Sequence, residues 1–266
     1  MIKVSKKYFV VSDLHSYYTI TKTCLEEKGW DDDNKEHILI VCGDAFDRGD
    51  ETLDLYFFLM RLLNDNRLIY IKGNHDILLK ELIGELERGA SIGAHHHHNG
   101  TLKTFFHFLD GECIGKHSVY EIARDVEIMF DKLYKNMVNY YELGNYIFVH
   151  GYIPTTIGFS DKPLSFEKVH KYKKNWRDSS DEEWEMAMWD NPFKIWDSKV
   201  KEPKKTIVCG HWNTGWAHYN LHNLGANEYD CNYTFKDKGI IGLDACVAES
   251  DKINVLVIKE DELYDD

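Results

Sequence analysis

Short apolar runs, each ending in a polar cluster, recur along this 266-residue chain and constrain its fold most strongly. The runs consist mainly of β-branched and aromatic residues and are bounded by glycine or aspartate. Runs of this length and composition predict strands buried on both faces. The predicted strands are Tyr8–Val11, His37–Val41, Leu68–Ile71, Tyr146–Val149, Thr206–Cys209, Gly239–Ile241 and Ile253–Ile258.

Helical patterns separate the early strands. Residues Thr52–Leu63 are amphipathic, and Ile77–Leu86 reads likewise. Alternation of strands and helices predicts an α/β fold with its ligand site at the carboxyl ends of the strands. Residues 85–142 are expected to be mostly helical, whereas 155–205 are rich in lysine, acidic residues and tryptophan without a clean pattern. We interpret both as insertions in a single domain spanning residues 1–266.

The charge balance narrows the classes of partner. The chain has 32 Lys and Arg against 45 Asp and Glu, a formal net charge of −13, so long nucleic acids are not expected to bind. No apolar run reaches the length of a membrane span, and the run at Tyr8–Val11 is too short for a signal peptide. The six cysteines form no C-x-x-C motif. We therefore expect a cytoplasmic protein with reduced thiols and no membrane partner.

Polar residues gather directly after five of the predicted strands. Any one of these clusters could arise by chance, but five in this position predict one shared site, because the carboxyl ends of parallel strands meet at one edge of a sheet. The clusters are Ser12-Asp13-Leu14-His15, Gly43-Asp44-Ala45-Phe46-Asp47-Arg48-Gly49, Gly73-Asn74-His75-Asp76, His150-Gly151 and Gly210-His211.

The residue types in these clusters fit a two-metal site. Asp13 and His15 alternate, so at the end of a strand they project in the same direction. Carboxylate, imidazole and amide groups suit Mn, Fe or Zn, and the absence of cysteine ligands argues against a structural zinc. A carboxylate such as Asp44 can bridge two ions, which together lower the pKa of a bound water and stabilise an in-line phosphoryl displacement.

This set of motifs resembles the calcineurin-like metallophosphoesterases, and within them the phosphoprotein phosphatase branch (PPP-like Ser/Thr phosphatases), with symmetrical diadenosine tetraphosphatases as close relatives. The resemblance runs from Asp13 to about Cys246 and leaves the two insertions unmatched. It implies a four-layer α/β/β/α sandwich and two divalent metal ions, with Mn²⁺ expected and Fe, Zn or Ni as alternatives. It also implies attack on phosphate by a hydroxide that bridges the metals.

The resemblance assigns a role to each position. The first metal would be held by Asp13, His15 and Asp44. The second would be held by Asp44, Asn74, His150 and His211. Arg48 would clamp the phosphate, and His75, oriented by Asp47, would protonate the leaving oxygen.

Smaller matches support the branch, and some positions depart from it. Asn99-Gly100-Thr101 with Thr104, and the segment ending in Asp244-Ala245-Cys246, resemble family segments. Ser12 and Ser16 replace glycines, and Asp76 replaces a glutamate. A second phosphate-binding arginine is not matched: Arg177 is the only arginine between His150 and His211, and its context differs. This leaves Lys201, Lys204 and Lys205 as candidates for a second cationic contact.

Three functions are compatible with these residues. The leading hypothesis is a phosphatase acting on phosphomonoesters of a phosphorylated protein or a small molecule. The first alternative is a diadenosine tetraphosphate hydrolase, for which the tryptophan-rich insertion would offer stacking surfaces. The second is a catalytically inactive metal-binding or scaffolding relative. The run His95–His98 is interpreted as a polar loop, with a lid or a metal-binding patch as alternatives. The oligomeric state stays open.

Overall fold

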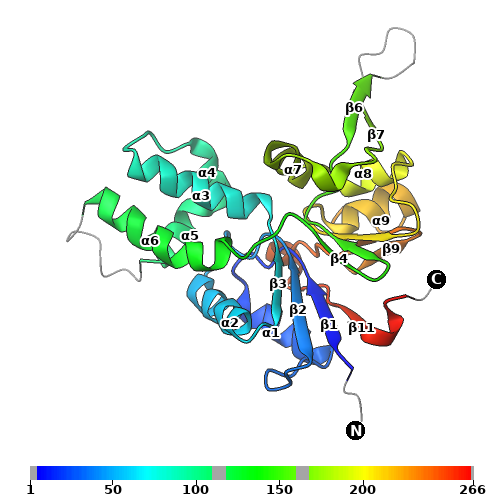
Figure 1. Ribbon diagram of the computed structural model, residues 1–266, viewed down its shortest axis with the longest axis horizontal. Helices are drawn as coiled ribbons and strands as arrows, with labels where there is room; N and C mark the ends of the chain where they lie inside the picture. The colour runs from blue at the N-terminus through cyan, green and yellow to red at the C-terminus, as the bar shows by residue number, and fades with distance from the viewer. Residues whose placement is uncertain (1–4, 110–117, 160–167, 265–266) are drawn as a thin grey trace.

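The computed structural model describes residues 5–109, 118–159 and 168–264 (Figure 1). Its first sheet has the strand order β11-β1-β2-β3. Strands β1, β2 and β3 are parallel, and β11 pairs with β1 in the antiparallel sense. Their bounds are β1 Lys7–Val11, β2 His37–Cys42, β3 Leu68–Ile71 and β11 Leu256–Lys259. The predicted strand at residues 253–258 therefore begins later than expected.

A second sheet has the order β4-β5-β8-β10-β9, with β5, β8 and β10 parallel and the two edge strands antiparallel. Its strands are β4 Tyr141–Leu143, β5 Tyr146–Phe148, β8 Thr206–Cys209, β9 Phe235–Asp237 and β10 Ile240–Gly242. The remaining strands, β6 Thr156–Phe159 and β7 Lys168–Lys171, form an antiparallel pair. Figure 1 shows this pair projecting at the top, away from both main sheets.

The two main sheets pack against each other. Apolar side chains from β1 and β2, such as Val10 and Ile40, join Phe148 of β5 and Val208 of β8 in one buried cluster between the sheets. This cluster explains why the strand sequences are apolar on both faces: one face meets the other sheet and the opposite face meets helices. The expected α/β/β/α layering is therefore confirmed.

Helices cover the outer face of each sheet. Their bounds are α1 Tyr18–Glu27, α2 Thr52–Asn64, α3 Asn74–Glu87, α4 Ala94–Asn99, α5 Thr101–His107, α6 Val119–Tyr134, α7 Asp181–Met188, α8 Pro192–Asp197, α9 Thr214–His222 and α10 Val247–Ser250, with 3₁₀ turns η1 Trp176–Asp178 and η2 Glu260–Glu262. The first sheet is covered by α1, α2, α3, α5 and α6, and the second by α7, α8 and α9.

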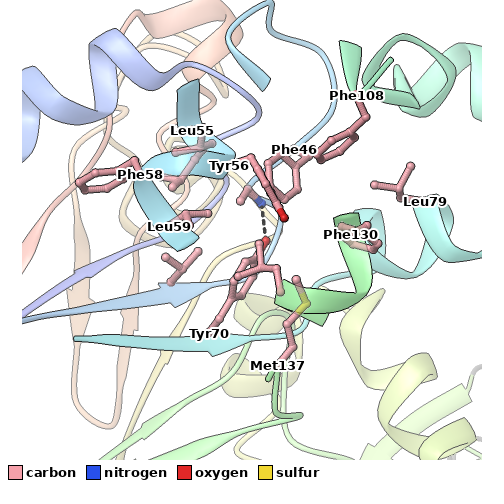
Figure 2. Close-up of a cluster of buried hydrophobic side chains, with 14 of the residues drawn as sticks. Phe46, Leu55, Tyr56, Phe58, Leu59, Tyr70, Leu79, Phe108, Phe130 and Met137 are labelled. Atoms are coloured by element: carbon pink, nitrogen blue, oxygen red, sulfur yellow. Dashed lines mark hydrogen bonds between the residues drawn. The ribbon is translucent and has the colours of Figure 1, made fainter. Parts of the chain in front are cut away.

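The two helical layers have different cores. Over the first sheet, Phe46 and Tyr70 meet aromatic and aliphatic residues from α2, α3 and α6 (Figure 2). Over the second sheet, Trp176 and Trp184 are buried, so most of the tryptophan-rich insertion is core rather than binding surface. Trp189 is the exception, because 51% of its surface is exposed.

The histidine run corrects one prediction. Residues His95–His98 lie within helix α4 instead of a polar loop, and His96 is fully buried. The insertion at 85–142 is mostly helical, as expected, through α4, α5 and α6. Cys113 lies outside the described residues. None of the helices in the described ranges is both long and apolar enough to cross a lipid bilayer.

Candidate metal centre

The predicted ligands converge at one edge of the paired sheets, beyond the carboxyl ends of the parallel strands. Every ligand comes shortly after the end of a strand. The residues are Asp13 and His15 after β1, Asp44 after β2, Asn74 after β3, His150 after β5 and His211 after β8. All but His211 are buried, and His211 is partly exposed. Six residues from five separate chain segments thus meet because these segments share one sheet edge.

Asp44 lies between two groups of possible ligand atoms. One group contains His15, Asp44 and His75, and the other contains Asp44, His150 and His211; within each, the candidate atoms lie within 4.8 Å of one another. His150 Nε2 is 3.2 Å from Asp44 Oδ2 and 2.8 Å from Asn74 Oδ1. One carboxylate reached from both sides has the placement that a bridging ligand requires.

Asp13 joins the first group from a slightly greater distance. Its Oδ1 lies 4.0 Å from His15 Nε2, and its Oδ2 accepts hydrogen bonds from the His211 amide, at 3.0 Å, and from the Ser12 hydroxyl. Ser12 therefore supports Asp13 from the position where related proteins have glycine. The departure from the family motif leaves the carboxylate in place.

The orientation of two imidazoles fits metal binding. Nδ1 of His15 lies 2.9 Å from the Phe46 carbonyl, and Nδ1 of His150 lies 2.8 Å from the Cys42 carbonyl. A carbonyl oxygen only accepts hydrogen bonds, so Nδ1 must carry the proton in both rings. Nε2 is then the ring nitrogen left for a cation in both residues, which is the arrangement that backbone carbonyls impose on metal-binding histidines.

Charge and burial act in opposite directions at the centre. Burial disfavours charge on Asp44, but His150 and His75 outweigh burial and hold the pKa of Asp44 well below its usual range. Burial would lower the pKa of His150, yet the Asp44 carboxylate raises it to about 10. Burial and the neighbouring His150 lower the pKa of His211 to about 3. A concentrated pair of opposite charges therefore occupies the place where cations would bind.

The backbone at this edge is unusually strained. Asp13, Asp44, Asp47, Arg48 and His211 all have positive φ, between 54° and 75°. Non-glycine residues rarely adopt this left-handed region, and such strain concentrates at functional sites, where the surrounding structure must hold it. The sharp turns let successive side chains after each strand aim at one point.

Glycines permit the segments to approach closely. A Cβ atom at Gly43 would lie 2.4 Å from His150 Nδ1, and one at Gly73 would lie 2.2 Å from Asp44 Oδ1. At Gly210 it would lie 2.2 Å from Asp13 Oδ2. The glycines of the motifs are therefore needed for space, and not only for turning the chain.

We expect Gly43→Ala to lower the free energy of unfolding by about 2–5 kcal/mol, because it combines a left-handed residue with overpacking against His150. Gly29→Ala is the matched control: its φ of +88° is close to the +82° of Gly43, but a Cβ there meets nothing within 4 Å. The control should cost only about 1–2 kcal/mol. Chemical denaturation of both variants measures the difference, and equal losses would contradict the predicted clash.

A second pair of side chains lies beside the candidate ligands. His75 Nδ1 is 2.7 Å from Asp47 Oδ2, and Thr101 Oγ1 donates to the same oxygen at 2.8 Å. The Asp47 amide donates to Thr104 Oγ1 at 2.9 Å. Burial disfavours the charged ring of His75, but the carboxylates of Asp44 and Asp47 raise its pKa above the ordinary value. The carboxylates thus favour the protonated ring, and the contact with Asp47 fixes its direction.

Arg48 completes this side of the site. Its side chain is exposed, and its Nη2 lies 3.4 Å from His75 Nε2. Gly100 supports the backbone here, since a Cβ at Gly100 would lie 2.6 Å from the Arg48 amide nitrogen. The segment with Gly100, Thr101 and Thr104 resembles a family motif in the sequence. In the structure it contacts Asp47 and Arg48 and holds them in position.

Residue Asp76 also takes a defined place. Its Oδ1 accepts a hydrogen bond from Tyr70 Oη and its Oδ2 accepts one from the Gly73 amide, both at 2.8 Å. These bonds fix the start of α3, which carries Asn74 and His75. The aspartate that replaces the family's glutamate is a supporting residue and leaves the ligands unaffected.

Two of the candidates for a second phosphate contact, Arg177 and Lys205, are held by other partners. Arg177 donates to Glu142 and Glu202 and stacks over Trp176, with its guanidinium 4.1 Å from the ring centroid. Lys205 precedes β8, at the opposite end of the strand from His211, and donates to the Gly144 carbonyl. The sequence did not single out Trp189, whose half-exposed ring packs edge-on against His211 with the ring centroids 5.9 Å apart.

Comparison with known proteins gives a consistent family and fold. The family model described as calcineurin-like phosphoesterase matches residues 6–247. A cold-active protein-tyrosine phosphatase of a psychrophilic Shewanella species is 13% identical, with 95% of this chain and 75% of that chain covered and a TM-score of 0.50. At such low identity the likeness concerns the fold alone.

Two further solved structures match with TM-scores below one half. A candidate diadenosine tetraphosphatase is 14% identical, covering 97% of this chain and 96% of that chain, with a TM-score of 0.46. A serine/threonine phosphatase from Saccharomyces cerevisiae is 13% identical, covering 96% and 79%, with a TM-score of 0.43. The comparison with curated protein sequences finds no significant match.

Proposed function

The chain belongs to the calcineurin-like phosphoesterase family, and on this premise we propose that it is a phosphatase that uses two divalent cations to hydrolyse phosphomonoesters. The observation that carries the proposal is the position of Asp44, which is shared by two groups of possible ligands. His75 and the exposed Arg48 lie directly beside it.

The proposed ligands divide as the family resemblance implies. Asp13, His15 and Asp44 would hold one cation. The other would be held by Asp44, Asn74, His150 and His211. Two cations bound there would lower the pKa of a water molecule and offset the negative charge of phosphate, and Mn²⁺ is the ion we expect. The ligands are carboxylate, amide and imidazole groups, which suit such an ion.

His75 is proposed as the general acid. Nδ1 donates to Asp47, so in the imidazolium form the second proton lies on Nε2, which is 3.4 Å from Arg48 Nη2 and 3.9 Å from Asp44 Oδ2. A proton at that position can pass to the oxygen of a departing alcohol, which otherwise would leave as a costly alkoxide. Asp47 acts as the positioning residue, and Thr101 fixes Asp47 in turn.

Arg48 is proposed as the phosphate clamp. Its guanidinium is exposed next to His75, and a planar fork can donate to two phosphate oxygens at once. The formal charge of −13 would otherwise repel a phosphate from the surface. Positive charge from Arg48 and bound cations would attract a small phosphate to the site despite the acidic surface around it. Long nucleic acids would still be repelled by that surface.

A metal-by-substrate matrix tests the proposal. Purified protein treated with a chelator should lose turnover of p-nitrophenyl phosphate, and Mn²⁺ should restore it, because removing the cations removes several kcal/mol of transition-state stabilisation. Restoration by Mn²⁺ but not by Mg²⁺ would fit the nitrogen ligands. Full activity after exhaustive chelation would contradict the proposal, and no turnover with any metal or substrate would favour a non-catalytic relative.

A second candidate function is cleavage of diadenosine tetraphosphate into two ADP. The half-exposed indole of Trp189, beside His211, favours it, since a base could stack there. The acidic surface opposes it, because a highly anionic substrate is captured slowly at low ionic strength. A panel of phosphopeptides and dinucleotides separates the two: turnover of the dinucleotide with inert phosphopeptides would replace the leading proposal.

A further inference from the structure

Helix α4 packs on α3 (Figure 1), and side chains that could hold a metal ion come together between these two helices. We define the α3–α4 cluster as Glu81 and Glu85 from α3 with His95 and His96 from α4. Glu81 and Glu85 are one helical turn apart, so both carboxylates project from the same face of α3. Glu85 Oε2 also accepts a hydrogen bond from the Gly93 amide at 3.1 Å, which fixes the start of α4.

His96 is the unusual member of the α3–α4 cluster. Its side chain is 0% exposed, and neither ring nitrogen has a hydrogen-bond partner among the residues that the structure describes. Buried polar groups almost always have a hydrogen-bond partner, so leaving one unpaired is unfavourable. A buried imidazole without hydrogen bonds can bind a cation through a ring nitrogen.

The spacing in the α3–α4 cluster suits a single small cation. His96 Nε2 is 3.4 Å from Glu85 Oε2, and His95 Nε2 is 3.5 Å from Glu81 Oε2. Zinc bonds to nitrogen and oxygen of about 2.0–2.2 Å in a tetrahedron place neighbouring ligand atoms about 3.3–3.6 Å apart. Candidate atoms of Glu81, His95 and His96 also lie within 4.8 Å of one another. Both His–Glu separations therefore match the spacing between neighbouring ligands of one zinc ion.

We propose that Glu81, His95 and His96, with Glu85 completing the set, form a zinc site that is separate from the catalytic centre. Two imidazoles and two carboxylates are a common ligand set for Zn²⁺ and a poor one for Mg²⁺ or Ca²⁺, which prefer oxygen alone. Two carboxylates also balance the charge of one divalent cation, so the buried His96 would not face a net charge.

The rest of the histidine run does not share this placement. His97 and His98 are both exposed, and His98 Nδ1 already contacts the Ala94 carbonyl at 2.8 Å. The proposed site is therefore built by the fold, and it is not the property of any four consecutive histidines. This difference supplies an internal control, because His97 is the same residue type in the same helix.

A zinc ion here would stabilise the segment that holds Asp47 and Arg48 in place. Helix α4 ends at Asn99, the following Gly100 packs against the Arg48 backbone, and Thr101 begins α5 and donates a hydrogen bond to Asp47. Tying α4 to α3 through one ion would reduce local opening of this corner. Hydrogen exchange of residues 94–107 should therefore slow when Zn²⁺ is added to the wild-type protein, and should change less in Glu81→Gln.

The experiment compares zinc binding by equilibrium dialysis of tag-free wild-type protein, His96→Ala, Glu81→Gln and the control His97→Ala. We expect His96→Ala to bind one zinc ion fewer per chain and Glu81→Gln to bind that ion at least about tenfold more weakly. His97→Ala should match the wild type. Glu81 is half exposed, so Glu81→Gln keeps the test informative if His96→Ala fails to fold.

Two outcomes would overturn the proposal. One is unchanged zinc binding in both His96→Ala and Glu81→Gln. The other is an equal loss in His97→Ala and His96→Ala, which would show that the run chelates without a defined geometry. Since the measurement is a difference between variants, zinc bound at the catalytic centre cancels. Failure of either proposal can therefore be recognised separately.

Discussion

Asp44→Asn is expected to lower turnover of p-nitrophenyl phosphate in Mn²⁺ by about 10³-fold or more. The asparagine keeps the shape of the side chain, and its oxygen can still accept the hydrogen bond from the His75 amide, which measures 2.9 Å in the native protein. It loses the negative charge on which both proposed cations depend. Several kcal/mol of charge stabilisation disappear with them, at 1.36 kcal/mol for each tenfold in rate. Steady-state kinetics and bound Mn²⁺ should fall together.

The control for this change is Asp65→Asn. Asp65 is a surface aspartate paired with Lys35, with a contact of 2.7 Å, and an exposed pair of this kind contributes little to stability. Its variant should keep wild-type turnover and metal content. Normal turnover by Asp44→Asn without bound Mn²⁺ would contradict the shared-ligand role, whereas loss of folded protein in thermal unfolding would identify a structural effect.

His75→Asn is the change with the second-largest expected effect, and its size should depend on the leaving group. Hydrolysis of a phosphoserine peptide should slow by about 10²–10⁴-fold, because serine leaves as a poorly stabilised alkoxide when no acid protonates it. p-Nitrophenolate is a stable anion, so p-nitrophenyl phosphate should be affected far less. Since the Asp44 and Asp47 carboxylates raise the pKa of His75, wild-type activity on the peptide should fall at high pH. His75→Asn should lack this alkaline decline.

Two further variants help to interpret that result: His97→Asn is the control, and Asp47→Asn tests the orientation of His75. His97 is an exposed histidine outside the site, so its variant should behave as wild type on both substrates. Asp47→Asn leaves His75 in place but weakens its orientation, so it should reproduce the leaving-group pattern in milder form. Equal slowing of both substrates by His75→Asn would contradict the acid role and indicate lost metal binding.

The strands and the polar clusters could be predicted because both are local in sequence. A buried parallel strand is a short apolar run, and the residues after it, such as Asp13 and Asp44, lie at a known edge of the sheet. Predicted strands at 68–71 and 206–209 match the observed bounds. The single-domain organisation and the assigned roles of the site residues stay predictions that the proposed experiments address.

The histidine helix, the packing of the tryptophan-rich insertion and the support of Asp47 depend on tertiary contacts, which a local sequence pattern does not predict. His95–His98 are polar residues, so the run was interpreted as a loop; packing against α3 makes it a helix with His96 inside. The tryptophan-rich insertion has no simple period because Trp176 and Trp184 pack on each other and on Tyr140, with a geometry set by tertiary structure. Likewise, the support of Asp47 by Thr101 joins residues 54 positions apart.

Anomalous diffraction from crystals of the Mn²⁺-activated protein tests the central claim most directly. The account predicts two peaks about 3.5–4 Å apart on either side of the Asp44 carboxylate. One should lie within coordination distance of His15, and the other within coordination distance of His150 and His211. Crystals of active protein with no anomalous peak near Asp44, or with a single peak that Asp44 does not contact, would contradict it.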